Sequence, residues 1–533
     1  MRRLGITRSS RKAGAMALAV FLAWGCQNYS ASGSSSSGGG TNASQPKQLK
    51  LDLNKAIEVA LPKFQRDLQP AAFKTTDGKQ GWALRIPGER PIATPAYADG
   101  MLFVGGGYGS HEFYAFDAET GKLVWQIKTS DDGPTAAVVE DGLVAFNTES
   151  CTLIVVEAKT GKLVWQEWLG DPLMSQPAIS QGRVYIAYPA GQHGKGHQQH
   201  PPAHIPQNHQ QAAKPPQQQA TQAGNNNGVD ESDVQGSHRL LCADLRTGRH
   251  LWERTITGDV ITAPVVSGDQ IFFTCFDGTS YSLRAVDGTV VWKKQNAGTS
   301  APVVANGDVL LTEKEQRGDK QYEGLKRYDA LRGAEKNEGL LAREEAQYLG
   351  ENKGGGVGIS AKSQAALDSS VGFSTAPEAA KLKEANKHLG VSTVVGAWAY
   401  QGSRAAYSRG RMLNAQGKYL NSLDAKDGRF AWRAEVSGVG VGDNQQIFSP
   451  PALGDQFMYL GSLLGHLVSV RQEDGELGFA YAFKQPMAFQ PALAGGNVYA
   501  GTNNGLLICL KTGDKDADGW HMWGGNAQHN KEQ

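Results

Sequence analysis

One short motif recurs along this chain and constrains its fold more than any other feature. An acidic residue opens a turn, a glycine closes it, and a tryptophan follows four residues after the glycine. The full copies span residues 117–125, 157–165, 244–252 and 424–432. In a further copy that ends at Trp292, the acidic position holds Arg284. A period of about 40 residues, built from short strands and turns, is typical of a propeller or another repeat array.

Within each copy, apolar and polar residues alternate over short stretches that are bounded by glycine turns. Such alternation is typical of half-buried antiparallel strands, and four of these strands make one propeller blade. Two degenerate copies extend the count. The turn at 328–333 has Asn337 at the tryptophan position, and the turn at 474–475 leads to Phe479.

The two ends of the repeat region complete each other. The last unit, residues 491–513, supplies three strands and no fourth, whereas the strand at 82–86 lacks its first three. Placing this N-terminal strand on the outside of the last unit predicts an all-β, eight-bladed β-propeller over residues 82–513, with four-stranded antiparallel blades. The count falls to seven if the poorly matching unit around Asn337 does not form.

Two stretches interrupt the repeat. Residues 190–236 are rich in Gln, His, Pro and Asn and cannot bury enough apolar surface to fold. Residues 338–392 form a longer insertion with Gly-rich arms and a helical pattern around 377–388. We therefore expect a disordered first insertion and a partly helical second one. In repeat arrays such insertions lie in loops on one face, which is often the binding face.

The N-terminus is typical of an exported protein. Basic residues precede an apolar stretch at 13–25 that is too short to span a bilayer. Residues 22–26, Leu-Ala-Trp-Gly-Cys, resemble a bacterial lipobox, which predicts a signal peptide over 1–25 and lipidation of Cys26. Gln27 stands where an Asp would favour the inner membrane, so we expect an outer-membrane anchor that faces the periplasm. Without lipidation the protein would be periplasmic or secreted.

Three further segments complete the domain organisation. Residues 26–50 begin with a Ser- and Gly-rich stretch and predict a flexible tether. In the lead-in, 51–81, apolar residues between 57 and 68 have helical spacing and predict a short helix, which a proline within the pattern ends or kinks. The Trp-rich tail, 514–533, is expected to pack its indoles against the propeller.

Charge and cysteine content argue against several classes of protein. A formal net charge of +1 provides no field that would attract nucleic acid. Apart from Cys26, the chain has no adjacent cysteines and no CxxC or CxxCH motif, so redox dithiol and c-type haem functions lose support. The remaining cysteines are Cys151, Cys242, Cys275 and Cys509.

The repeat, exemplified by residues 114–125, resembles the tryptophan-docking repeat of pyrroloquinoline-quinone (PQQ) type propellers over roughly residues 82–513. Aromatic residues at this position dock between neighbouring blades and bury a large apolar area. The resemblance therefore implies a structural, blade-docking role for Trp82, Trp125, Trp165, Trp252, Trp292, Trp432 and Phe479.

The superfamily that the repeat resembles has two branches. One comprises quinoprotein dehydrogenases, which bind PQQ and Ca2+ in the axial funnel and oxidise alcohols or sugars. Adjacent cysteines cover the cofactor in the alcohol-oxidising members, and this chain lacks them, as the sugar-oxidising members do. The other branch comprises non-enzymatic propellers, among them the lipoprotein of the outer-membrane β-barrel assembly machine.

We favour the second branch, because export, a lipid anchor, a tether and a rigid propeller with decorated loops are what a scaffold needs. The expected function is that of a monomeric, non-enzymatic propeller lipoprotein without a cofactor, which binds another envelope protein. Outer-membrane protein assembly is one such role. Since a fold alone does not determine function, a PQQ- and Ca2+-dependent dehydrogenase stays the alternative.

Metal binding is a second alternative. The first insertion offers imidazoles that suit Zn, Cu or Ni, although the surrounding Gln and Pro fix no geometry. These histidines are His193, His197, His200, His204 and His209. Asp514, Asp516 and Asp518 resemble the opening of a Ca2+ loop, but the twelfth position is Gly525 rather than Glu. A solvated loop and an acidic turn, respectively, are the competing interpretations.

Overall fold

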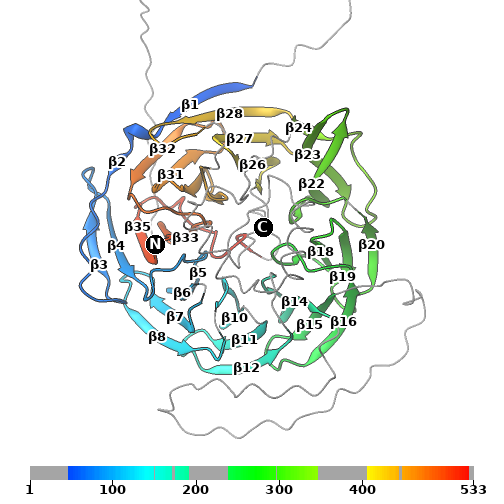
Figure 1. The fold of residues 1–533 in the computed structure, drawn as a ribbon, viewed down its shortest axis with the longest axis horizontal. Coiled ribbons are helices and arrows are strands. Elements are labelled where there is room, and N and C mark those ends of the chain that lie inside the picture. The colour runs from blue at the N-terminus through cyan, green and yellow to red at the C-terminus, as the bar shows by residue number, and fades with distance from the viewer. Residues whose placement is uncertain are drawn as a thin grey trace, which may run out of the picture. The chain divides into compact units, whose positions relative to one another are not determined.

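Alternating apolar residues and glycine turns fold this chain into eight small sheets arranged around a ring (Figure 1). The structure is a computed structural model, and it describes residues 46–526 except 108, 132, 149–150, 171–174, 191–237, 296, 346–404 and 443–446. Cys26 and the five histidines of the first insertion lie outside the described residues.

The first four blades follow one another along the chain, each with its strands in sequence order from the axis outward. Blade 1 contains β5 (Ala96–Ala98), β6 (Met101–Gly105), β7 (Glu112–Asp117) and β8 (Leu123–Lys128). Blade 2 contains β9 (Val138–Glu140), β10 (Leu143–Asn147), β11 (Thr152–Glu157) and β12 (Leu163–Trp168). Blade 3 contains β13 (Ala178–Ser180), β14 (Arg183–Pro189), β15 (His238–Asp244) and β16 (His250–Ile256). Blade 4 contains β17 (Val265–Ser267), β18 (Gln270–Thr274), β19 (Ser280–Arg284) and β20 (Val290–Lys294).

The remaining blades continue the ring and include the degenerate unit around Asn337, so the count is eight rather than seven. Blade 5 contains β21 (Val303–Ala305), β22 (Asp308–Arg317), β23 (Lys320–Asp329) and β24 (Leu341–Glu345). Blade 6 contains β25 (Ala405–Ser408), β26 (Arg411–Gln416), β27 (Tyr419–Asp424) and β28 (Phe430–Ser437). Blade 7 contains β29 (Ala452–Leu453), β30 (Phe457–Gly461), β31 (His466–Arg471) and β32 (Leu477–Ala482). Blade 8 contains β33 (Ala492–Ala494), β34 (Asn497–Gly501), β35 (Leu506–Lys511) and, from the N-terminal side, β4 (Gln80–Arg85).

The ring closes as the sequence predicts. Strand β4 pairs antiparallel with β35, and Trp82 lies opposite Cys509. The first strand of the repeat region thus becomes the fourth strand of the last blade. Because this pairing joins the two ends of the repeat region, no blade at the closure is left with an incomplete sheet.

The segment ahead of β4 corrects two expectations. The helix predicted between residues 57 and 68 does not form, and residues 47–50 belong to a strand rather than to the tether. Instead, β1 (Lys47–Asp52) and β2 (Ile57–Glu58) pair in parallel with β28 and β32, and β3 (Ala71–Lys74) pairs antiparallel with β4. Among the described residues ahead of β4, the one helical turn is the 3-10 helix η1, Leu53–Lys55.

We call residues 47–74 the strap, because they run along the outer edges of blades 6, 7 and 8 (Figure 1). The physical reason for the difference is the proline inside the helical pattern together with the free edges of β28 and β32. A proline ends a helix, whereas an unpaired strand edge offers backbone hydrogen bonds to an extended segment.

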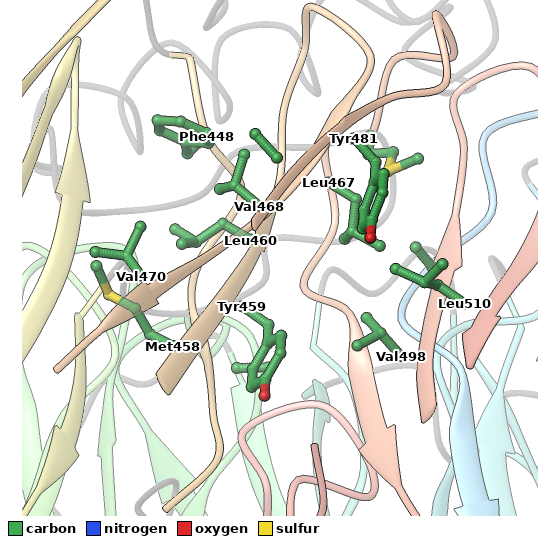
Figure 2. Close-up of a cluster of buried hydrophobic side chains, with 14 of the residues drawn as sticks. Phe448, Met458, Tyr459, Leu460, Leu467, Val468, Val470, Tyr481, Val498 and Leu510 are labelled. Carbon is green, nitrogen blue, oxygen red and sulfur yellow. The ribbon is translucent and has the colours of Figure 1, made fainter. Parts of the chain in front are cut away.

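Each blade buries both of its faces against its neighbours. In blade 7, Leu460, Val468 and Val470 point to one side of the sheet, whereas Leu467 and Tyr481 point to the other, toward Leu510 of blade 8 (Figure 2). This alternation follows from the two-residue period of a strand. Apolar clusters of this kind fill the spaces between blades around the ring. Among the described residues, no helix has the length and apolar character to cross a membrane.

Candidate functional site

Six of the repeated tryptophans lie at the seams between consecutive blades. Each indole Nε1–H donates to a backbone carbonyl oxygen in the glycine turn of the next blade, over 2.8 to 3.2 Å. The donor and acceptor residues are Trp82 and Ala118, Trp125 and Ala158, Trp165 and Leu245, Trp252 and Ala285, Trp292 and Ala330, and Trp432 and Gln472.

The residue types of the motif follow from this docking. Asp117 Oδ1 accepts hydrogen bonds from the backbone N–H and the hydroxyl of Thr120, which holds the turn closed. The closing glycine has a positive φ and faces the indole: at Gly161, with φ +68°, an added Cβ would lie 2.7 Å from the Trp125 ring. A β-bulge beside Trp125 twists the outer strand toward this turn. The motif therefore serves to join blades.

Phe479 does not take part in this pattern. Its ring packs within its own blade, with centroid distances of 6.0 Å to Tyr459 and 5.1 Å to Tyr481. The corresponding turn glycine, Gly513, has no atom within 4 Å of an added Cβ. A phenyl ring is smaller than an indole and carries no N–H, so it cannot form the seam contact.

The acidic turn ahead of the tail closes this seam instead. Asp516 is 9% exposed, and its carboxylate accepts hydrogen bonds from the backbone N–H groups of Gln456 and Phe457 and from the hydroxyl of Tyr459. Asp514 Oδ1 accepts from the Asp516 N–H, and Asp518 Oδ1 accepts from the N–H groups of two glycines. The structure thus directs these three carboxylates to different backbone groups and does not bring them together.

The described part of the C-terminal tail, residues 514–526, packs against inner strands of several blades. Trp520 and Trp523 are 1% and 5% exposed. The Trp520 backbone pairs with Leu493 of blade 8, and the Tyr97 N–H of blade 1 donates to the His521 carbonyl at 2.6 Å. On the other side, Trp523 lines a small cavity with Val303 of blade 5 and Ala405 of blade 6. The tail therefore pairs with blades 8 and 1 through its backbone and lies beside blades 5 and 6 with Trp523.

The described inner ends of the blades present hydroxyl groups that bond to the backbone. Hydroxyl groups at the starts of inner strands donate to the adjacent backbone carbonyls, as in Thr135, Ser300 and Ser449. Throughout the part of the chain that the structure describes, no three His, Cys, Asp or Glu side chains gather where they could hold a metal ion.

The four cysteines of the propeller are buried and unpaired with one another. Burial raises the pKa of each thiol, which disfavours the reactive thiolate. These residues, Cys151, Cys242, Cys275 and Cys509, therefore act as small apolar side chains of the blades.

The rim of the ring differs between its two halves. The outermost strands of blades 6, 7 and 8 carry strap strands, whereas β8, β12, β16 and β20 are sheet edges in the described chain. Trp82 and Trp432 lie on blades with strap strands and are 4% and 1% exposed. On the other half Trp292 is buried too, at 8%, whereas three tryptophans are partly exposed: Trp125, Trp165 and Trp252. Apolar side chains beside them are exposed as well, including Leu123, Val124, Val164, Val290 and Val291.

A charged network on this rim was not foreseen from the sequence. His250 lies between two carboxylates, with Nε2 2.8 Å from Glu167 of blade 2 and Nδ1 2.8 Å from Glu253 of its own blade. These hydrogen bonds, to Glu167 first and Glu253 second, raise the pKa of His250 to about 10. Arg239 donates to Glu253 at 2.9 Å. No sequence signal marks the network, because Glu167 and His250 are separated by the whole first insertion.

Comparison with known proteins supplies a family. A sequence profile of the family described as outer membrane protein assembly factor BamB matches residues 69–195, 232–345 and 379–519. No curated protein sequence matches the chain.

Several solved structures resemble the propeller. BamB from Moraxella catarrhalis aligns with a TM-score of 0.47 and 12% identity over 80% of this chain and 96% of its own. A quinohemoprotein alcohol dehydrogenase from Comamonas testosteroni aligns with a TM-score of 0.47 and 12% identity over 81% of this chain and 76% of its own. Sqt1 from Saccharomyces cerevisiae aligns with a TM-score of 0.49 and 8% identity over 79% of this chain and 96% of its own. At these values the likenesses carry no argument about function.

Proposed function

The chain belongs to the family of the outer membrane protein assembly factor BamB, and from this premise we propose that it is a non-enzymatic, protein-binding scaffold of the bacterial cell envelope. In this proposal the protein is exported, is held at the outer membrane by a lipid on Cys26, and serves outer-membrane protein assembly. The propeller is the rigid body that presents a binding surface to a partner in the periplasm.

The observation that carries the proposal is the tail at the axis. A quinone dehydrogenase needs a polar pocket there, with carboxylates for Ca2+ and room for a planar cofactor. Here the buried indoles of Trp520 and Trp523 lie among inner strands of blades 1, 5, 6 and 8. Nearby, the side-chain oxygen of Gln490 accepts a hydrogen bond from the Gly524 N–H at 2.9 Å.

The rim supports the same proposal from the outside. Exposed apolar side chains beside unpaired strand edges are a feature of surfaces that contact other proteins. On this chain they occur on blades 1, 2 and 4, and the strap leaves these blades uncovered. A scaffold uses its surface, whereas an enzyme of this fold uses its axis.

Affinity capture from the cell envelope tests the proposal. The full chain with a C-terminal tag is expressed in its own bacterium, and crosslinked membranes are solubilised and passed over the affinity resin. We expect an outer-membrane assembly protein in near-stoichiometric amount, and we expect a Cys26→Ala variant to leave the outer-membrane fraction. Recovery of the tagged chain without a specific partner would overturn the proposal.

Incubation with cofactor tests the competing dehydrogenase function. Purified protein is mixed with PQQ and Ca2+, then assayed for the absorbance of bound quinone and for dye reduction with alcohols and aldoses. We expect neither signal. Saturable quinone binding together with substrate-dependent dye reduction would replace the scaffold with an enzyme.

A further inference from the structure

The strap demonstrates how this propeller takes up an extended strand at its rim. Strand β1 pairs in parallel with β28, with Leu49 opposite Ala434 and Leu51 opposite Val436. Leu49 also lies beside the Trp432 ring at the Gly475 turn. Strand β2 adds to β32 in the same parallel sense. The outer edges of the blades therefore accept strands that carry apolar residues two positions apart.

Blade 1 repeats this geometry without a cover. Strand β8 is the outermost strand of its sheet, so one row of its peptide groups faces away from β7 without a partner strand in the described chain. In the repeat, Trp125 and Ile127 occupy the positions that Trp432 and Ala434 occupy in blade 6. Leu123 and Val124, next to the partly exposed Trp125, are 38% and 48% exposed. On blade 6 the pairing with β1 begins at Trp432, the position that matches Trp125, and continues along the strand to Ser437.

The charges at this edge select the kind of strand that fits. Exposed Lys122 precedes β8, exposed Lys128 ends it, and the strand contains no acidic residue. Within the described residues neither lysine has an ion-pair partner. On two other edges a charge within the strand is already engaged: Glu167 of β12 binds His250, and Lys294 of β20 lies 4.4 Å from the Tyr328 ring centroid. A second copy of this chain would bring the same lysines to β8 and be repelled.

We propose that the outer edge of β8 is the docking site for an extended, acidic segment of a partner protein, which adds to blade 1 as a further strand. The proposal rests on the scaffold function and names its surface. Backbone pairing with β8 provides affinity, and alternate side chains provide specificity. The segment carries apolar residues two positions apart, as β1 does, and carboxylates at its ends that meet Lys122 and Lys128.

Peptide binding to the full chain provides the first test. The probe is a fluorescent peptide of alternating Val and Glu; one control peptide has a central Pro, which cannot pair as a strand, and another has Lys in place of Glu. We expect the acidic peptide alone to bind at low ionic strength.

A double variant of the protein, Lys122→Glu with Lys128→Glu, should weaken binding of the acidic peptide by about tenfold, since rim charges are screened but additive. Lys162→Glu, at the position in blade 2 that matches Lys122, should change it by less than about twofold.

Hydrogen exchange on the same complex locates the peptide. Amides of residues 122–129 should exchange more slowly with the acidic peptide bound, and those of residues 162–168 on β12 should not change. Equal protection of both segments, or equal binding of all three peptides, would overturn the proposal.

Photocrosslinking in cells separates this proposal from the scaffold function. A photoreactive residue is placed at Val124 on the edge of β8, or at Val286 in a turn of blade 4, which is 57% exposed. Crosslinking of the captured partner from position 124 and not from 286 supports the β8 site. Crosslinking from position 286 alone would overturn the β8 docking site but would still agree with the proposed scaffold function. Failure at both positions, with no partner in the affinity capture, overturns both.

Discussion

At the scale of single residues, six of the eight seams depend on one glycine and one indole that meet across them. Gly161 faces the Trp125 ring and also needs a positive φ, which an L side chain rarely adopts. Gly182 has nearly the same φ, +69°, with no atom within 4 Å of an added Cβ. Alanine substitutions at these two glycines therefore distinguish two losses of stability: the loss from a strained backbone, which both share, and the loss from a blocked seam, which only Gly161 has.

We predict that Gly161→Ala destabilises the propeller more than Gly182→Ala. The control should cost about 1 kcal/mol through its backbone alone. The Gly161 variant should cost about 1–3 kcal/mol more, because its methyl group displaces the docked indole. Denaturant midpoints by tryptophan fluorescence measure both variants, and equal midpoints would contradict the role of the seam.

His250 makes the stability of the rim depend on pH. Its pKa in the folded state, about 10, exceeds the ordinary value of 6.5 in the unfolded chain, so protonation favours folding. The contribution is complete below pH 6.5, declines above it, and is lost as the pH rises through about 10. Since 33% of the His250 side chain is exposed, we expect only about 1–2 kcal/mol.

Thermal unfolding of His250→Gln across this pH range measures the contribution. The deficit against the parent protein should be largest at pH 6 and shrink toward pH 9.5, while exposed His111→Gln serves as the control. A deficit that does not change with pH would show that His250 contributes by packing alone.

The docking role of the tryptophans could be predicted from the sequence, because the glycine turn and the tryptophan that meet at a seam both belong to the repeated motif. The sequence wrongly predicted that Phe479 docks between blades. Phenylalanine is a conservative replacement for tryptophan, but it lacks the N–H group and the ring size on which the seam contact depends. The role of His250 could not be predicted, because contacts between charged residues of different blades leave no spacing to recognise.

At the scale of secondary-structure elements, the strap is the largest departure from expectation. Its apolar residues between 57 and 68 have helical spacing, yet the segment is not helical. The reason is that free strand edges on blades 6 and 7 offer backbone hydrogen bonds to an extended chain. Those edges arise from the tertiary structure, so one segment's sequence cannot show them. The ring itself is predictable because every blade repeats the same alternation and turn.

We predict that Leu51→Ala loosens the strap without unfolding the ring. Leu51 is 5% exposed, and truncating a leucine in such a place costs about 2–3 kcal/mol. Faster amide exchange in β1 and stronger acrylamide quenching of Trp432 should follow. The neighbouring Lys50→Ala, at an exposed position, should leave both unchanged; quenching that rises equally in both variants would contradict the assignment.

We predict that Asp516→Ala weakens the seam between blades 7 and 8. The change leaves the Tyr459 hydroxyl and two backbone N–H groups without their acceptor, which should cost about 2–4 kcal/mol. The adjacent exposed Lys515→Ala is the control. Denaturant midpoints measure the loss, and a midpoint unchanged in the Asp516 variant would mean that the tail does not hold this seam.

At the scale of the whole molecule, the closing strand, the strap and the tail each cover a different part of the propeller. The closing strand completes blade 8, the strap runs along the rim of blades 6 to 8, and the tail contacts inner strands of blades 1, 5, 6 and 8. In the described structure the rim of blades 1 to 4 carries no strap strand. In the scaffold that we propose, the partner binds at this outer edge rather than at the axis.

Native mass spectrometry of the tagged chain, purified from envelope membranes in mild detergent, tests this account most directly. The scaffold predicts a defined complex whose mass equals one copy of this chain plus an outer-membrane assembly protein, and it predicts that Lys122→Glu with Lys128→Glu lowers the fraction of that complex. A lone chain that gains the mass of a quinone and Ca2+ when these are supplied would contradict it.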